Sequence, residues 1–188
     1  METKNIYNTT ILNHYNNNWG TEYQIKRDDK GPMKTSSHDY YVLEYPPNSK
    51  RNIWTYATCG MFSFNENMPI ELHIFSLFQD EKLVELLTAV SYYQISEDKL
   101  NLNHTVNFGV PWQPGSRCSY GLISLPYLDG PNLEILRIDP SRAVHFYWLI
   151  PITEEERNYK KKYGIEALEE RFDQNKFNYI DPLRKSVV

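Results

Sequence analysis

Apolar residues recur along the chain with two different periods, and these periods predict a mixture of helices and strands. In residues 5–19 they recur at helical spacing, and the residues concerned are Ile6, Ile11, Leu12, Tyr15 and Trp19. Residues 81–93 follow Asp80, which suits the N-cap of a second helix with a broad apolar face. Short runs of β-branched and aromatic residues predict strands at 22–27, 38–45, 52–58, 70–78, 102–108, 120–124 and 133–138.

One stretch late in the chain carries the most complete local signature. Ala143–Ile150 is almost wholly apolar, as expected of a strand buried on both faces. Pro151 is expected to end that strand, because it cannot donate to a ladder. Thr153 and Glu156 have the spacing of a capping box, which predicts the start of a helix. Glu156 also precedes Lys160 by one helical turn and is expected to face it.

Together these elements predict an α+β fold, with a mixed, mainly antiparallel β-sheet flanked by α-helices in a single compact domain over residues 1–188. The strands at 38–45 and 52–58 are separated by a Pro-Pro-Asn-Ser loop and are expected to pair antiparallel. The chain has 188 residues, of which 40% are apolar. This length and composition are enough for one substantial core without help from metals or disulfides.

Cysteine usage and the opening residues predict a soluble, cytoplasmic protein. Cys59 and Cys118 are the two cysteines, and neither belongs to a C-x-x-C pair, which fits a reducing compartment. Residues 1–10 are polar and do not resemble a signal peptide. The longest apolar run, 143–150, is far too short to span a bilayer, so no membrane partner is expected.

The net charge of −4 is mild, but it is unevenly distributed. Residues 51–100 carry seven acidic and three basic side chains, which accounts for the whole excess. Two interpretations stand: a solvated helix face with its loops, or an acidic surface for a basic partner. The candidate partner-binding residues are Glu66, Glu81, Glu85, Glu97, Asp98 and Trp112. Trp112 is included because its Pro- and Gly-rich loop predicts an exposed aromatic side chain. Nothing indicates the basic surface of a nucleic-acid-binding protein.

The residues that could carry chemistry form no catalytic or metal-binding pattern. The five histidines are scattered, without H-x-H or H-x-x-x-H spacing. Ser116 lies in Pro-Gly-Ser-Arg rather than in a G-x-S-x-G elbow, and it is interpreted as a loop residue that binds backbone amides. Cys118 is interpreted as a small apolar residue. No phosphate loop or dinucleotide fingerprint is present. The sequence therefore predicts no catalytic residue, no metal site and no cofactor.

A series of spaced motifs runs along most of the chain. They are Thr58–Met61, Ile70–Ile74 followed by Glu85–Thr88, His104–Gly109 with Pro114–Ser116, Phe146–Glu156, Tyr163–Glu169 and Asp181–Arg184. In this order they resemble the suppressor-of-fused family, over roughly residues 10–186. Cys59 stands where the family has serine, which is a small departure.

The resemblance implies a fold that binds proteins and is not an enzyme. In animals it forms the N-terminal half of a protein that grips a transcription factor between two domains, and this chain is too short for the second domain. Stand-alone bacterial members resemble immunity proteins of polymorphic-toxin systems, some of which are paired with nuclease toxins. The leading hypothesis is therefore a non-catalytic immunity protein, or antitoxin, that binds and neutralises a cognate toxin, with a basic nuclease as one candidate.

Two alternatives stand beside this hypothesis. In the first alternative, the chain is a general adaptor or regulator that sequesters another protein, such as a transcription factor. In the second, it is a hydrolase that uses Ser116 or Cys118. An adaptor would have no toxin gene beside it, and a hydrolase would lose turnover in Ser116→Ala or Cys118→Ala variants. The sequence makes no prediction of the oligomeric state, and no direct contact with nucleic acid is expected.

Thr153→Ala is expected to lower the free energy of unfolding by about 1 kcal/mol, because it removes the side-chain cap of the helix. Partner binding should be unchanged, since the resemblance makes this stretch part of the scaffold. Chemical unfolding and a pull-down with the partner measure the two quantities. A folded Thr153→Ala variant that binds much less partner would overturn this assignment.

Overall fold

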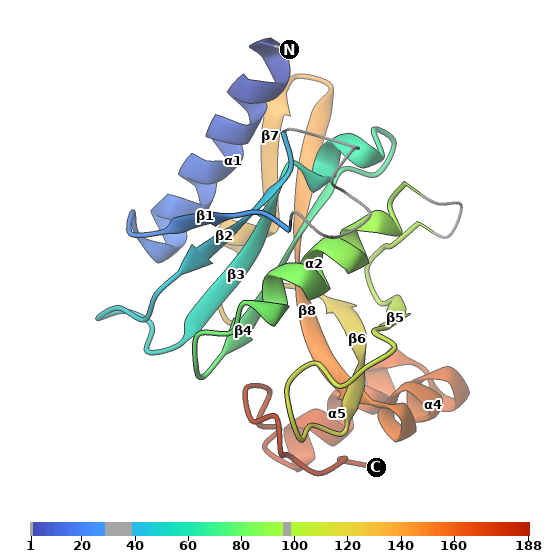
Figure 1. Cartoon of the computed structure of the whole chain (residues 1–188). Coiled ribbons are helices and arrows are strands. Elements are labelled where there is room, and N and C mark those ends of the chain that lie inside the picture. The colour runs from blue at the N-terminus through green and yellow to red at the C-terminus, as the bar shows by residue number, and fades with distance from the viewer. Residues whose placement is uncertain (1, 29–38, 96–98) are drawn as a thin grey trace.

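A twisted mixed sheet runs through the middle of the molecule and carries helices on both of its faces (Figure 1). The computed structural model describes residues 2–28, 39–95 and 99–188. Within these ranges, the sheet has eight strands: seven follow the order β1-β2-β3-β4-β8-β6-β5, and the eighth, β7, pairs with β8 off this path. The expected α+β class, with a mixed and mainly antiparallel sheet, is confirmed.

Each described strand overlaps a segment whose residues predicted one. The strands are β1 (Gln24–Lys26), β2 (Tyr41–Tyr45), β3 (Trp54–Cys59), β4 (Ile70–Ser76), β5 (Thr105–Asn107), β6 (Cys118–Ser124), β7 (Ile135–Asp139) and β8 (Arg142–Thr153). β2 and β3 form the expected antiparallel pair, with Leu43 opposite Ala57. β4 and β8 run parallel, with Ile70 opposite His145, and the other described pairs are antiparallel.

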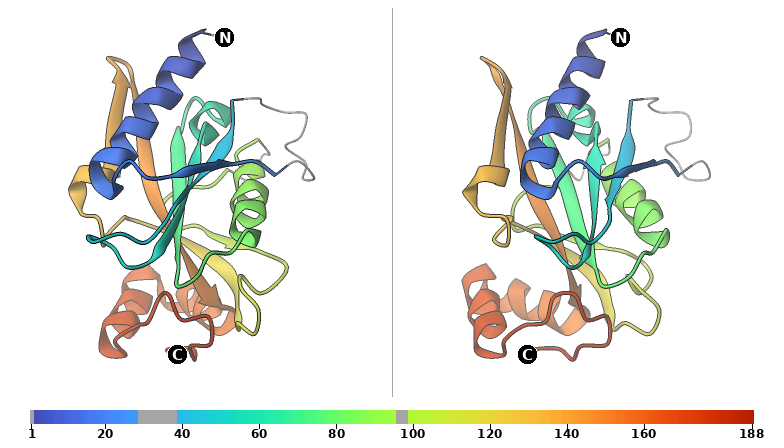
Figure 2. Two further views of the ribbon diagram at one scale, coloured as in Figure 1. Left: turned by 60° about the vertical axis from the view of Figure 1, so that its left-hand side comes forward. Right: turned by 90° about the vertical axis from the view of Figure 1, so that its left-hand side faces the viewer.

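Helices cover both faces and one end of the sheet. They are α1 (Glu2–Trp19), α2 (Lys82–Tyr92), α3 (Pro131–Glu134), α4 (Glu154–Tyr163) and α5 (Ile165–Gln174), with a 3-10 turn, η2 (Met61–Phe64), after β3. Figure 2 shows α1 and α2 on opposite faces, and α4 and α5 together near the C-terminus. On α1, Ile11 and Tyr15 are buried as expected, whereas Ile6 is 61% exposed. No helix in the described part of the chain is long and apolar enough to cross a membrane.

Side chains of β8 alternate between the two faces and divide the core into three clusters. Tyr147 and Leu149 belong to the cluster beneath α2. Phe146, on the opposite face, packs with α1 and α3 in a second cluster. Trp148 and Ile150 point to that same face and pack with α5 in a third cluster. α1 and α5 therefore share one face of the sheet, and α2 covers the other.

β8 continues through Pro151, so the expectation that the strand stops there is wrong. Gly121 of β6 lies opposite Pro151, and the register extends to Thr153. β4 pairs with β8 only as far as Trp148, and the Pro151 carbonyl accepts a hydrogen bond at 2.9 Å from Arg184, which lies outside the sheet. The N–H and C=O of a strand residue point to the same side, so the missing N–H of Pro151 removes no ladder bond with β6.

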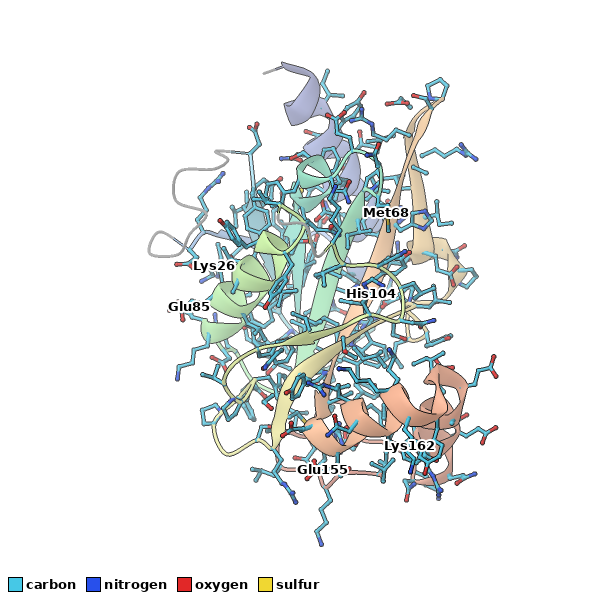
Figure 3. All side chains as sticks on the ribbon, turned by 90° about the vertical axis from the view of Figure 1, so that its right-hand side faces the viewer. Lys26, Met68, Glu85, His104, Glu155 and Lys162 are labelled. Carbon is cyan, nitrogen blue, oxygen red and sulfur yellow. The ribbon has the colours of Figure 1, made fainter. Side chains whose placement is uncertain are left out.

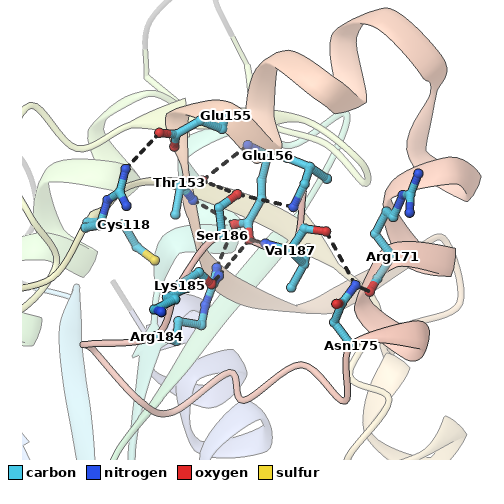
Figure 4. Close-up of polar contacts among 12 residues, drawn as sticks. Cys118, Thr153, Glu155, Glu156, Arg171, Asn175, Arg184, Lys185, Ser186 and Val187 are labelled. Atoms are coloured by element: carbon cyan, nitrogen blue, oxygen red, sulfur yellow. Dashed lines mark hydrogen bonds and ion pairs between the residues drawn. The ribbon is translucent and has the colours of Figure 1, made fainter.

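A buried ion pair between Glu156 and Arg184 joins the start of α4 to the C-terminal segment (Figure 4). The guanidinium donates to both carboxylate oxygens, at 2.6 and 2.7 Å. The same carboxylate accepts the amides of Thr153 at 2.8 Å and Val187 at 3.1 Å. The Thr153 hydroxyl accepts the Glu156 amide at 3.2 Å, so the predicted capping box is confirmed. The prediction that Glu156 faces Lys160 is wrong, because the Glu156 carboxylate is fully buried and pairs with Arg184.

The carboxyl group of Glu71 holds the turn that follows β3. It is fully buried and accepts the Thr58 hydroxyl and the amides of Gly60 at 2.9 Å and Phe62 at 3.1 Å. Glycine is required at position 60, because its φ is +102° and a Cβ would lie 2.5 Å from the Asp39 carbonyl oxygen. Burial raises the pKa of Glu71 to about 7, against the opposing effect of these hydrogen bonds. A buried acid thus fixes the turn through its backbone amides.

Arg184→Ala is expected to lower the free energy of unfolding by about 3–5 kcal/mol, because it leaves the Glu156 carboxylate buried without its counter-ion. Arg117→Ala is the matched control, since the ion pair of Arg117 with Glu155 is exposed and should contribute less than about 1 kcal/mol. Urea unfolding followed by tryptophan fluorescence measures both losses. Similar losses in the two variants would contradict the assigned role of Arg184.

Candidate protein-interaction surface

Ser116 and Cys118, the two residues considered as nucleophiles, are both buried, and they are joined by a hydrogen bond. The Ser116 hydroxyl accepts the Cys118 amide at 3.0 Å, and Gly115 before it has a φ of +79°, so the predicted loop role of Ser116 is confirmed. Cys118 is 1% exposed, and burial raises the pKa of its thiol, which disfavours the reactive thiolate. Within the described ranges, no three His, Cys, Asp or Glu side chains are close enough to share a metal ion.

A buried polar cluster lies where β4 meets the loop at 125–130. His73 of β4 is fully enclosed, and its Nε2 is 3.7 Å from Oδ2 of Asp129. Asp129 Oδ1 accepts hydrogen bonds from Trp19 Nε1, at 2.7 Å, and from the Arg51 guanidinium. Burial, reinforced by the charge of Arg51, lowers the pKa of His73 to about 3, so the imidazole is neutral. Local patterns could not reveal this cluster, because its members come from four separate segments.

Two of the predicted partner-binding residues lie at the start of α2, Glu81 directly before the helix and Glu85 in its first turn. Glu81 and Glu85 are exposed, and Glu81 lies 3.8 Å from the Nζ atom of Lys26 in β1. In the view of Figure 3, Lys26 and Glu85 are both labelled at this edge of the molecule. Glu97 and Asp98 lie outside the described residues. Of the candidate partner-binding acids that the structure describes, two therefore lie at the start of α2, one of them beside a cation.

Glu66 and Glu71, two other acids of the same block, do not extend this surface. Glu66 is exposed in the loop before β4 and lies 3.7 Å from Arg142, which begins β8. Met68, two residues after Glu66, is well apart from Glu85 in Figure 3. Glu71 is fully buried and contributes nothing to the surface. Among the described acids discussed above, the exposed carboxylates thus lie in two separate places, and one carboxyl group is in the interior.

The expectation that Trp112 is exposed is wrong. Its side chain is 3% exposed and packs in the cluster beneath α2. The loop folds back because the Gln113 side-chain amide donates to Ser76 at 2.9 Å and to Asp80 at 3.2 Å. The Trp112 amide also donates to the Cys118 carbonyl at 3.0 Å. Turn chemistry predicted a loop here but carried no information on which surface the loop covers, and Trp112 is not retained as a partner-binding residue.

A groove with a volume of about 730 Å³ opens between α5, the sheet and the loop at 125–130. We call it the α5 groove, and its apolar lining includes Leu122, Tyr127, Trp148, Phe172, Phe177 and Tyr179. Tyr127 is 61% exposed, and its neighbour Leu128, which also lines the groove, is 43% exposed. Binding pockets for small ligands have volumes of about 300–1,000 Å³, and the α5 groove falls in that range.

Acidic side chains of α5 line the same groove. Glu169 and Asp173 lie one turn apart on the helix. Burial, together with the nearby charges of Asp173 and Glu166, raises the pKa of Glu169, and a hydrogen bond with Tyr127 opposes the rise. Lys176 also lines the groove, but no ion pair among the described residues joins it to either acid. The groove is therefore apolar within and negatively charged at α5.

The family model of suppressor of fused protein matches residues 34–185, which is most of the chain. The chain belongs to the suppressor of fused family. Motifs that resemble this family in the sequence coincide with buried polar contacts of the structure. Thr58–Met61 forms the turn held by Glu71, and Thr153 and Glu156 form the capping box that Arg184 completes. These particular suppressor of fused motifs therefore have a structural role in this chain.

Solved structures of the suppressor of fused family share the fold. A Neisseria gonorrhoeae protein described as a suppressor of fused homologue is 33% identical over 97% of each chain, with a TM-score of 0.82. A chain of the Sufu–Fu complex is 14% identical, with a TM-score of 0.66 over 96% of this chain and 92% of that one. Drosophila Suppressor of Fused is also 14% identical, with a TM-score of 0.66 over 95% of this chain and 50% of that one. The last two likenesses concern the fold alone. No curated protein matches the chain.

His73→Phe is expected to make the stability of the protein less sensitive to acid. The folded-state pKa of His73, about 3, lies below the unfolded value of 6.5, so the unfolded chain takes up a proton that the folded protein does not. Wild-type stability should therefore fall as the pH is lowered from about 6.5 towards 3, by up to about 1.4 kcal/mol per pH unit from this residue. His73→Phe should lose that component.

Unfolding free energies measured between pH 7 and pH 4 would give the difference between the two proteins. Phenylalanine is a suitable replacement, because Trp19 and Phe75 surround the ring and neither ring nitrogen has a hydrogen-bond partner among the described residues. His104→Gln serves as the control, since His104 is exposed. Parallel pH profiles for wild type and His73→Phe would refute the assignment.

Proposed function

We propose that this member of the suppressor of fused family is a non-catalytic protein-binding domain that acts by occupying a surface of its partner. The observation that carries the proposal is the α5 groove, which is apolar, of binding-site size, and bordered by the exposed side chains of Tyr127 and Leu128. The fold likeness to a chain of the Sufu–Fu complex supports the same class of function. The buried thiol of Cys118 and the loop role of Ser116 give no support to a hydrolase.

The most specific form of this proposal is an immunity protein that works in the cytoplasm and neutralises a cognate toxin by binding it. Support comes from the similarity to a bacterial homologue of suppressor of fused and from the resemblance of short bacterial members to immunity proteins. The net charge of −4 and the exposed carboxylates of Glu81 and Glu85 would attract a basic toxin, such as a nuclease. Glu66, Glu97 and Asp98 stay candidates for the same role.

A regulator that sequesters another protein is the second candidate. It is favoured by the fold likeness to a chain of the Sufu–Fu complex. The two candidates make different demands on the partner. An immunity protein binds the product of a neighbouring toxin gene and protects the cell, whereas a regulator binds a protein whose removal alters gene expression or signalling.

Co-expression with the neighbouring toxin gene tests the immunity proposal. We expect the chain to restore growth of cells that express the toxin, and to be recovered with the toxin as a stoichiometric complex. The measurements are colony counts and co-purification followed by size-exclusion chromatography. Failure of both rescue and co-purification, with the chain expressed and folded, would refute the immunity role.

Charge changes on α2 test the role of the acidic surface in association. In a stopped-flow measurement with the toxin, the Glu81→Lys/Glu85→Lys double variant should associate about tenfold more slowly than wild type at low salt, because it reverses the local field. The difference should shrink at high salt, where the charges are screened. The neutral double variant, Glu81→Gln/Glu85→Gln, should fall between the two. Equal rates for all three proteins at low salt would show that α2 does not face the toxin during the encounter.

A further inference from the structure

We propose that the α5 groove binds an arginine-bearing segment of a partner protein, whose arginine side chain lies along the aromatic lining and ends beside Glu169 and Asp173. This inference rests on the proposed function only in taking the occupant to be a protein. It assigns a chemistry to that protein: an exposed basic segment with at least one arginine. The argument has three steps, which concern the lining, the acids that form no ion pair among the described residues, and the position of the groove in the fold.

The lining of the groove is a set of aromatic rings that already pack against one another. The rings of Phe172 and Phe177 are stacked with centroids 4.1 Å apart, and those of Trp148 and Tyr179 meet edge to face at 4.9 Å. Tyr127 adds a fifth ring from the opposite loop. Such surfaces favour the planar guanidinium group and the apolar stem of arginine, by cation–π attraction and stacking.

The protein uses the same chemistry for its own arginines around this cluster. The guanidinium of Arg184 lies 4.4 Å from the ring centroid of Phe177, on the C-terminal segment that lines the groove. The guanidinium of Arg51 lies 4.6 Å from the centroid of Phe75, a member of the same apolar cluster. Each of these arginines also ends on a carboxylate, Glu156 or Asp129. An arginine with both an aromatic ring and an acid is thus a repeated arrangement in this fold.

The α5 groove offers that arrangement without the arginine. Glu169 and Asp173 line it, and no ion pair among the described residues joins either of them to a cation. With Glu166 they form a row of acids along one side of α5, and the mutual repulsion contributes to the raised pKa of Glu169. A guanidinium placed between Glu169 and Asp173 would relieve this repulsion and could bind both carboxylates.

The groove and the acidic residues of α2 lie on opposite faces of the sheet. Trp148 and Ile150 line the groove, whereas Leu149 between them belongs to the cluster beneath α2. A single short segment therefore cannot contact both places. Variants of α5 and variants of α2 can be interpreted independently of each other, which makes the inference testable apart from the proposed function.

The test is a titration of the 15N-labelled protein with a short synthetic peptide that has a central Leu-Arg-Tyr-Arg sequence. We expect saturable chemical-shift changes at the indole N–H of Trp148 and at the amides of residues 169–179. A peptide with citrulline in place of arginine keeps the shape but lacks the charge, and it should bind about tenfold more weakly or not at all. Equal binding of the two peptides would overturn the inference, as would changes confined to α2.

Two variants of neighbouring residues on α5 provide matched controls. Glu169→Lys should abolish the shift changes, whereas Glu170→Lys makes the same charge change at an exposed position outside the groove and should leave binding within about twofold of wild type. If Glu169→Lys fails to fold, Glu169→Gln takes its place, with an expected loss of about tenfold. Equal loss in the position-169 and position-170 variants would attribute binding to net charge and would refute the groove.

Two further outcomes separate this inference from its rivals. If the groove is occupied by a second copy of the chain, sedimentation will show a dimer that dissociates on adding the arginine peptide, and the assignment to a partner protein is wrong. In a pull-down with the toxin, normal capture by Glu169→Lys would refute the groove as the binding site, and the immunity role would then rest on rescue and co-purification alone. Failure of the wild type to capture any toxin would remove the immunity role, and the peptide titration would still decide the chemistry of the groove.

Discussion

The buried pair of Glu156 and Arg184 is the interaction on which the C-terminal third of the structure depends. Each ion would cost several kcal/mol to bury alone, so the pair persists only because neighbouring polar groups complete its hydrogen bonds. The carboxylate accepts the Thr153 amide at the start of α4, and the guanidinium donates to the Pro151 carbonyl at the end of β8. By stacking on Phe177, Arg184 also places the C-terminal segment beside α5. The shape of the α5 groove therefore depends on a contact that lies outside it.

β4 shows the same constraint in a different form. Its seven residues are all buried, because helices cover both faces of the sheet, so its polar side chains must be accommodated inside the protein. Glu71 is accommodated by the amides of the turn after β3, and His73 by remaining neutral beside Asp129. Each buried polar residue of β4 thereby binds or contacts a loop at the margin of the sheet.

The sequence predicted what is encoded by neighbouring residues and missed what is encoded by distant ones. Hydrophobic periodicity placed the strands and both long helices, and the capping box was recognised because Thr153 and Glu156 lie within one helical turn. The partner of Glu156 could not be found in this way, because Arg184 is encoded in a different segment and contacts it only in the folded chain. The prediction that Trp112 is exposed was wrong for the same reason. Its burial depends on hydrogen bonds from the Gln113 side chain to Ser76 and Asp80, which are distant in the sequence.

Of the two candidate surfaces, one is visible in the sequence and the other is not, and they would select a partner by different interactions. The acidic excess of residues 51–100 is visible in the sequence, but an exposed negative field attracts any basic protein and is weakened by salt. The α5 groove is invisible in the sequence, because its lining comes from β6, β8, α5 and the segments that follow them. Its apolar walls and its two carboxylates would distinguish one basic segment from another. A basic side chain whose apolar stem does not fit the groove would leave the aromatic lining uncovered. In the proposed function, α2 would therefore govern how fast a basic partner arrives, and the groove would govern which partner stays.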